Sequence, residues 1–223
     1  MKQIIKTAEP QSLVQHRANQ PAFFDNLPLV AKEDLRQSLL SEQGYICCYC
    51  MKRIPENTAP YMKVEHYKCQ DFYEDLQLNY KNLFGACIGN EGQPSRIQTC
   101  DTKKGNTELT INLLTNAPYC ENLFKYNAEG EIMSVDDNSE INRQLNEVLN
   151  LNMQTLKEGR SEVYLEVQRK VEAHSRQLGS KQLRVNYFER EKQDCLTPRD
   201  KKLKQYCMIA VYYLNKKIKQ HQH

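Results

Sequence analysis

The placement of the cysteines is the feature that most constrains how this chain can fold. Nine cysteines are distributed over 223 residues. Cys47 and Cys50 form a Cys-x-x-Cys pair, and Cys87 and Cys100 follow in a later segment. Two thiolates three positions apart can lie on one tight turn and bind one ion, and a second pair from a distant segment completes a tetrahedron. The pattern predicts a closed, structural Zn²⁺ site with these four ligands.

Two alternatives to this zinc site stay open in the sequence. Cys48 could replace Cys47 as a ligand, or the cysteines could be buried free thiols, which pack as small hydrophobic side chains. A disulfide framework is disfavoured, because the cysteine count is odd and no apolar segment long enough for a secretion signal follows Met1. The cysteines without a partner pattern are expected to be free: Cys69, Cys120, Cys195 and Cys207.

Charge and hydropathy limit the cellular compartments and the classes of partner that we expect for this chain. The formal net charge is only +3, which by itself does not indicate a nucleic-acid-binding protein. The longest apolar run near the C-terminus, Met208–Leu214, is far shorter than the ~20 residues that cross a membrane. We therefore expect a cytoplasmic protein that has no membrane partner.

Hydrophobic periodicity predicts an α-rich α+β chain. A helix is expected over Lys32–Glu42, ending before Gly44, and a hairpin turn at Glu129–Glu131 precedes a strand over Ile132–Val135. Segment 110–127 is helical or irregular. Beyond Ser139 several helices are expected: one with Ile141, Leu145, Val148 and Leu149, one with Val163, Val167 and Val171, and a last one with Leu203, Tyr206, Cys207, Ala210, Tyr213 and Leu214.

The motifs between the cysteines follow a recognisable order. The order is Cys47 and Cys50, then Glu65-His66, then Asn82-Leu83, then Cys87, and finally Cys100-Asp101 followed by Lys104. This order resembles the McrA-like branch of the HNH, or ββα-metal, endonucleases. In that branch the pattern runs Cys-x-x-Cys, acidic-His, Asn-Leu, Cys, and Cys-His-x-x-Lys. The resemblance covers residues 45–106 and rests on the ordered set, not on any single motif.

The resemblance implies a role for each matched residue. His66 takes the position of the general base, and Glu65 takes that of an acidic metal ligand beside it. Asn82 takes the position of the asparagine that fixes the loop holding the histidine. Lys104 matches the lysine after the last motif, where we expect a contact to a substrate phosphate, a surface lysine being the equal alternative. For His66 taken alone, the alternative is a structural histidine.

One position departs clearly from the family pattern. Asp101 stands where the family has its final histidine, and residues 88–99 form an insertion between the last two cysteines. Because carboxylates bind hard cations well, the change favours Mg²⁺ or Mn²⁺ over Zn²⁺ at the catalytic position, held by Glu65 and Asp101. In the implied ββα fold, a strand over 62–65 leads to His66, and a second strand covers 82–86. A helix that begins near Cys100 then returns Asp101 to the side of Glu65.

These roles together describe the hydrolysis of a phosphodiester bond. A neutral imidazole can take a proton from water near neutral pH, and a divalent cation can bind the scissile phosphate and the leaving oxygen. The sequence leaves the substrate open between DNA and RNA such as tRNA. The alternative function is a non-catalytic, zinc-stabilised nucleic-acid-binding or scaffold module, although a scaffold has no need of Glu65, His66 and Asp101.

The ends of the chain resemble a narrower family, the HNH subunit PtuB of Septu-type and retron-associated antiphage systems. The segments that carry this resemblance are Met1–Lys6, Glu9-Pro10, Arg17, Leu149–Asn152 and Ala210–Leu214. It implies a PtuA-type ATPase as partner and, in retron systems, a reverse transcriptase with its multicopy single-stranded DNA. We therefore expect an N-terminal segment with a helix (1–44), an HNH core with the zinc site (45–135) and a helical region (136–223). That last region either docks a partner or packs on the chain's own core.

Overall fold

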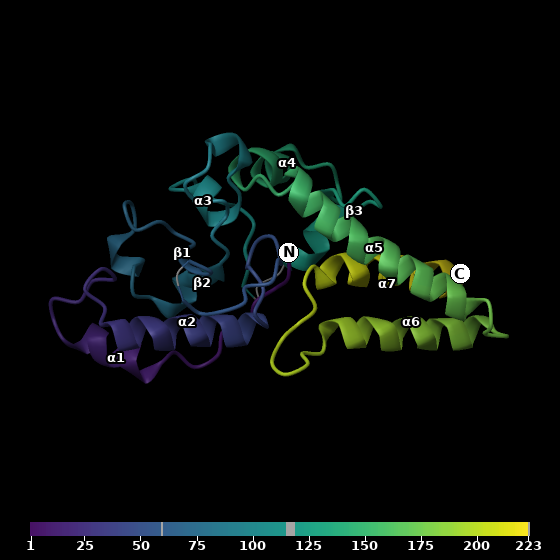
Figure 1. Ribbon diagram of the computed structural model, residues 1–223, viewed down its shortest axis with the longest axis horizontal. Coiled ribbons are helices and arrows are strands. Elements are labelled where there is room, and N and C mark those ends of the chain that lie inside the picture. Colours follow the sequence, from purple (N-terminus) through teal and green to yellow (C-terminus); the bar gives the residue numbers. More distant parts are fainter. Residues whose placement is uncertain (59, 115–118, 223) are drawn as a thin grey trace.

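The chain is arranged as a region of short strands and turns beside an arm of longer helices (Figure 1). The computed structural model describes residues 1–58, 60–114 and 119–222. The strands and the cysteine-rich turns lie over helix α2 (Leu29–Gln43). The arm consists of α5 (Gln154–Ser175), α6 (Lys181–Leu196) and α7 (Cys207–Gln222). Across the described ranges, no helix combines the length and the apolar character that crossing a bilayer requires.

Helix α2 confirms the expected N-terminal helix and positions the first cysteine pair. Helix α1 (Gln11–Ala18) packs against it. Gly44 ends α2 in the left-handed conformation, at φ 64°, and its N–H bonds back to the Leu40 carbonyl. A Cβ atom at Gly44 would lie 2.5 Å from a side-chain carbon of Leu203. Glycine therefore both ends the helix and lets the C-terminal segment approach, and the turn with Cys47 begins at once.

The first strand pair and the helix after it form the centre of the cysteine-rich region. Strands β1 (Lys63–His66) and β2 (Leu83–Ala86) pair antiparallel, with His66 opposite Leu83. Both lie within a residue of the expected strands, and α3 (Cys100–Lys104) begins where a helix was expected. The side chain of Gln43 bonds to both backbone groups of Gly85, at 2.7 and 2.8 Å. Helix α2 is thereby tied to the buried strand β2.

A second strand pair follows, and only half of it was expected. Strand β4 (Ile132–Ser134) and the preceding turn at Glu129–Glu131 match the prediction. Strand β3 (Phe124–Tyr126) does not, because segment 110–127 was expected to be helical or irregular. Residues 115–118 of that segment lie outside the described residues. A three-residue strand is too short to show a clear two-residue period, so the sequence carries little signal for β3.

The C-terminal helices differ from the expected ones mainly at one boundary. Helix α4 (Ser139–Arg143) runs into a wider helical turn over Gln144–Val148, and Gly179 separates α5 from α6 as expected. The last helix was expected to include Leu203 and Tyr206, but α7 begins at Cys207. The backbone N–H of Leu203 instead bonds to Gly44, and that of Tyr206 bonds to Met51, each at 3.0 Å. These contacts to the cysteine turn hold the segment out of the helix.

Candidate active site and metal centre

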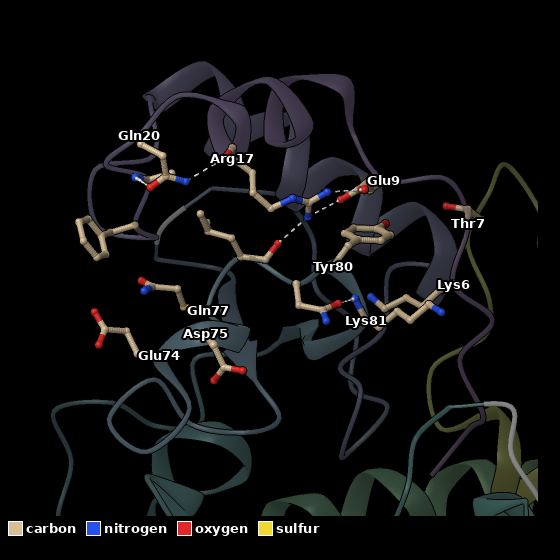
Figure 2. Close-up of a pocket in the computed structure, with 14 residues that line it drawn as sticks. Lys6, Thr7, Glu9, Arg17, Gln20, Glu74, Asp75, Gln77, Tyr80 and Lys81 are labelled. Carbon is tan, nitrogen blue, oxygen red and sulfur yellow. Dashed lines mark hydrogen bonds and ion pairs between the residues drawn. The ribbon is translucent and has the colours of Figure 1, made fainter.

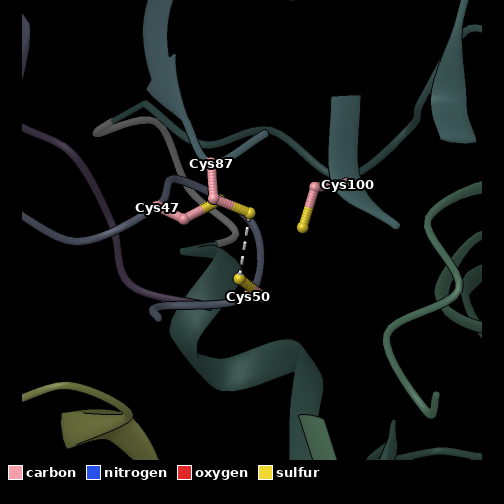
Figure 3. Close-up of side chains that lie close together, drawn as sticks. All are labelled: Cys47, Cys50, Cys87 and Cys100. Carbon is pink, nitrogen blue, oxygen red and sulfur yellow. Dashed lines mark hydrogen bonds between the residues drawn. The ribbon is translucent and has the colours of Figure 1, made fainter. Parts of the chain in front are cut away.

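The four predicted zinc ligands come together in one cluster (Figure 3). The thiol sulfurs of Cys47, Cys50, Cys87 and Cys100 all lie within 4.8 Å of one another, and the Cys50 and Cys87 sulfurs are 3.8 Å apart. A tetrahedral Zn²⁺ with Zn–S bonds of about 2.3 Å separates its sulfurs by about 3.8 Å. The donor set and its size therefore fit a metal such as zinc. Cys48, the alternative to Cys47, lies outside the cluster.

Three separate elements supply these thiols. Cys47 and Cys50 lie on the turn after α2, where a bridge between Ile46 and Arg53 closes the turn. Cys87 directly follows β2, and Cys100 is the first residue of α3. A metal bound here would fasten α2, the strand pair and α3 to one point.

His66 ends strand β1, and a backbone carbonyl fixes its ring. Its Nε2 lies 3.0 Å from the carbonyl oxygen of Gln77, and the ring of Phe24 packs edge-on against it at 4.6 Å between centroids. Because a carbonyl only accepts, Nε2 must carry the hydrogen, which leaves Nδ1 as the basic nitrogen of the neutral ring. Burial lowers the pKa of His66 below its ordinary value, against the opposing effect of the Gln77 carbonyl. The imidazole is therefore neutral near pH 7.

Asn82 holds the loop that leaves His66. Its side-chain oxygen accepts from the backbone N–H of Lys68 at 2.8 Å. Its amide nitrogen donates to the carbonyls of Lys68, at 2.9 Å, and Leu76, at 3.2 Å. Both ends of the segment between His66 and Gln77 are thus attached to one side chain. This is the position in which a loop-fixing asparagine is expected to act.

The carboxyl groups of Glu65 and Asp101 are neighbours, and each shifts the pKa of the other. Burial and the Asp101 carboxyl raise the pKa of Glu65 well above its usual range, against the opposing effect of Lys104. Burial would raise the pKa of Asp101 too, but the neighbouring Glu65 carboxyl and the charge of Lys63 bring it below its usual value. Two carboxyls this close need a proton or a cation between them.

Three further side chains surround this carboxyl pair. The Tyr49 hydroxyl donates to Glu65 Oε1 at 2.6 Å, and the Lys104 ammonium lies 2.9 Å from the same oxygen. Lys63 Nζ lies 3.0 Å from Asp101 Oδ2. Each carboxyl therefore keeps one oxygen, Glu65 Oε2 and Asp101 Oδ1, that no donor within the described ranges contacts through an ion pair or hydrogen bond.

Lys104 occupies a different environment from the one expected of a phosphate contact or a surface lysine. Its side chain is 1% exposed, and its ammonium also donates to the carbonyls of His66 and Gly105. The surface alternative is wrong for this residue, because the side chain is buried. The phosphate contact stays a prediction, and it would require the ammonium to leave Glu65.

The N-terminal segment supports the loop that holds His66. This segment and loop 74–81 line an open pocket of about 900 Å³ (Figure 2). The guanidinium of Arg17 forms two bonds to Glu9, at 2.7 and 2.9 Å, and one to the Leu78 carbonyl, at 3.1 Å. The backbone N–H of Phe24 donates to the side chain of Gln77 at 2.9 Å. Residues before α2 thus hold the carbonyl that orients His66.

Sequence reasoning missed Tyr49, Lys63 and Gln77. Tyr49 lies inside the cysteine motif, and its position between two cysteines was the one available signal. Lys63 is two residues before Glu65 on β1, so its side chain projects from the same face of the strand. Gln77 acts on His66 through its backbone carbonyl, which every residue type possesses and no sequence motif marks.

Comparison with known proteins relates the chain to two defence proteins. No family model matches it. It is 29% identical over 122 residues to a protein of Escherichia coli named as the HNH endonuclease of retron Ec83, which covers 48% of this chain and 47% of that protein. It is 33% identical over 87 residues to the Septu protein PtuB of Bacillus thuringiensis, covering 39% of this chain and 31% of that one.

The matched segments therefore span less than half the length of either relative. Both names agree with the resemblance that the ordered motifs and the chain ends indicated. The chain is related in sequence to a protein named as a retron HNH endonuclease and to a Septu protein named PtuB.

Replacing Cys87 by serine is expected to prevent folding. Removal of one thiolate from a structural zinc site forfeits much of a binding free energy on the order of 10 kcal/mol that is linked to folding. The Cys87→Ser protein should be insoluble or unfolded by circular dichroism. The matched control, Cys195→Ser, changes a buried thiol on α6 outside the cluster and should keep one Zn²⁺ per chain. A folded, zinc-free Cys87→Ser protein would contradict the assignment.

Proposed function

We propose that the chain is a metal-dependent HNH endonuclease that hydrolyses phosphodiester bonds in nucleic acid. The observation that carries this proposal is the setting of His66. A carbonyl fixes its ring with Nδ1 unprotonated, and its chain neighbour Glu65 contacts a second carboxyl, that of Asp101. A scaffold protein gains nothing from placing a buried carboxyl beside a second, partly buried one, because such a pair is costly unless a proton or cation lies between them.

The local fold supports assigning these residues to a ββα-metal core. Strands β1 and β2 pair antiparallel, and α3 follows them in the chain. His66 ends the first strand, and Asp101 is the second residue of the helix. This is the order of elements that the family resemblance implies. The proposed core spans residues 45–135.

The carboxyl pair fits a hard divalent cation, Mg²⁺ or Mn²⁺. The donors would be the two oxygens left without a partner, Glu65 Oε2 and Asp101 Oδ1. Mg²⁺ is commonly held in proteins by one or two carboxylates and otherwise by water and phosphate oxygens. When bound, such a cation supplies charge neutralisation for the scissile phosphate and the leaving oxygen.

The protein's own residues account for the proton transfer and for the alignment. Nδ1 of His66 takes a proton from the attacking water, while the Gln77 carbonyl keeps the ring oriented. Asn82 keeps the loop carrying that carbonyl in place. Tyr49 and Lys104 hold Glu65 by one oxygen. Attack by water leaves a 5′-phosphate and a 3′-hydroxyl on DNA or RNA, whereas a 2′,3′-cyclic phosphate would indicate attack by the ribose 2′-hydroxyl.

Replacing His66 by alanine is expected to remove cleavage and leave the fold intact. Loss of a general base lowers the rate by about 10² to 10⁴. Plasmid DNA and tRNA should be tested separately with Mg²⁺. His174→Ala, which alters an exposed histidine on α5, should cleave at the wild-type rate. Cleavage by His66→Ala at that same rate would refute the assignment, and no cleavage by the wild type, alone or with its partner, would favour the scaffold alternative.

Replacing Asp101 by alanine is expected to raise the Mg²⁺ concentration that cleavage requires. One of two protein ligands is lost, and excess Mn²⁺, which accepts similar ligands, should restore part of the rate. Glu91→Ala is the matched control, because Glu91 also pairs with Lys63 but is largely exposed. Its metal requirement should not change. If Asp101→Ala cleaves normally at low Mg²⁺, the ligand assignment fails.

The relatives' names also support a role in antiphage defence, with a PtuA-type ATPase as the proposed partner. A retron reverse transcriptase and its multicopy single-stranded DNA are further proposed partners, from the first relative's name. The helical region 136–223 is the proposed docking part. Much of α7 is buried in the chain's own core, so docking must use what that packing leaves exposed. Leu183 on α6 is 52% exposed and is such a residue.

Replacing Leu183 by aspartate is therefore expected to remove the ATPase from the purified complex. A charge at a desolvated apolar contact weakens association strongly. The test is co-purification after joint expression with the neighbouring ATPase. Ile5→Asp is the control, because Ile5 is similarly exposed but belongs to the N-terminal segment. Undiminished co-purification with Leu183→Asp would place the docking surface elsewhere.

A further inference from the structure

A groove with positively charged side chains lies beside the candidate active site. It has a volume of about 290 Å³ and runs between α2 and β1. Lys32 and Arg36 of α2 line one wall, and Lys63 and Val64 of β1 line the other, with Phe24 also on its surface. Lys32 and Arg36 are four positions apart, so they lie on one face of the helix. None of these five residues belongs to the cysteine cluster.

Two residues of the groove lining, one on β1 and one before α2, are in direct contact with the proposed catalytic groups. Lys63 forms its ion pair with Asp101 at 3.0 Å. Phe24 packs against the ring of His66 at 4.6 Å. The carboxyl pair and the proposed general base thus lie directly behind two residues of the groove lining. A polymer that lies along it passes beside the atoms that would cut it.

The helix-side wall offers cationic groups that have no acidic partner among the described residues. Lys32 donates to the backbone carbonyl of Asp25 at 3.1 Å and lies 5.9 Å from the centre of the Phe24 ring. Within residues 1–58, 60–114 and 119–222, the side chain of Arg36 makes no hydrogen bond or ion pair, and its Nε is buried without a partner. An unsatisfied buried N–H is costly, which points to an acceptor supplied from outside the chain.

Other cations near the site are already engaged. Lys63 is bound to Asp101 and Glu91, Lys68 to Glu108, and Lys104 to Glu65. Glu91 is the one acidic residue among those lining the groove, and it pairs with Lys63, which it shares with Asp101. The free positive charge of the groove therefore comes from Lys32 and Arg36. Its natural ligand is an anion that extends along the groove.

We propose that this groove binds the phosphodiester backbone of the substrate strand, with Lys32 and Arg36 contacting phosphates next to the bond that is cut. The proposal rests on the proposed nuclease function and names its substrate-binding surface. It assigns this binding role to a helix outside the ββα elements. The contacts are to phosphate oxygens, so they hold the strand in position without reading its sequence.

Binding can be measured apart from cleavage in the 223-residue chain carrying His66→Ala. Fluorescence anisotropy with labelled single-stranded DNA, single-stranded RNA and duplex DNA over a range of salt concentrations gives affinity and salt dependence. Lys32→Gln/Arg36→Gln should lower the slope of log affinity against log salt by about 1.4 to 1.8, and weaken binding roughly tenfold or more at low salt. Arg36→Lys alone should retain most of the slope, because it keeps the charge.

The control pair, Arg169→Gln/Lys181→Gln, removes the same charge from the exposed surface of α5 and α6 and should change neither quantity. Circular dichroism verifies that each protein is folded. The proposed binding role of the groove is refuted if the two double variants lose affinity equally, if neither loses any, or if none of the three nucleic acids binds.

Wild-type cleavage, assayed in parallel, keeps the groove proposal and the nuclease proposal separate. If Lys32→Gln/Arg36→Gln cleaves at the wild-type rate, only the groove proposal is refuted. If the wild type does not cleave but its binding depends on the groove residues, only the nuclease proposal is refuted.

Discussion

The convergence of four thiols is the constraint on which the candidate site depends, because the elements around it are too short to hold together alone. Strands β1 and β2 have four residues each, and α3 has five. An isolated two-stranded hairpin is marginally stable at best in water. A structural Zn²⁺ supplies on the order of 10 kcal/mol, which is comparable with the whole stability of a small domain. Tyr49 and Asp101 each adjoin a cysteine of the cluster, so the same contacts position them beside Glu65.

A second constraint is the network of acidic and basic side chains around the buried carboxyl of Glu65. Glu65 and Lys104 pair with both side chains 1% exposed, and Asp101 and Lys63 extend the network toward the surface. Removing one member of such a network leaves an uncompensated buried charge, which is strongly destabilising. The near-neutral net charge of the chain conceals this arrangement, because opposite charges that meet inside cancel in the sum. The attraction of an anion to the surface then depends on where the unpaired cations of the described residues lie, more than on how many the chain carries.

The features that could be predicted from the sequence are those that depend on local patterns. The cysteine spacing predicted the cluster, and Gly44 marked the end of α2 because its backbone adopts a left-handed conformation. The order of the motifs placed β1, β2 and α3 within about a residue. The features that escaped prediction are set by tertiary contacts. The start of α7 is decided by the bonds of Leu203 and Tyr206 to the cysteine turn. The burial of Lys104 follows from its pairing with Glu65, which nothing in its neighbouring sequence reveals.

The partner of His66 is a main-chain atom, and this has a consequence for how such a site can change over evolutionary time. Any amino acid at position 77 would still present a carbonyl oxygen to the imidazole, so the acceptor itself cannot be mutated away. The conformation of the loop is what must be conserved, and Asn82 and the segment around Phe24 maintain it from two sides. The side chain at position 77 still matters, because it accepts from the backbone N–H of Phe24. A substitution there would therefore keep the acceptor for the imidazole and lose one of the contacts that place it.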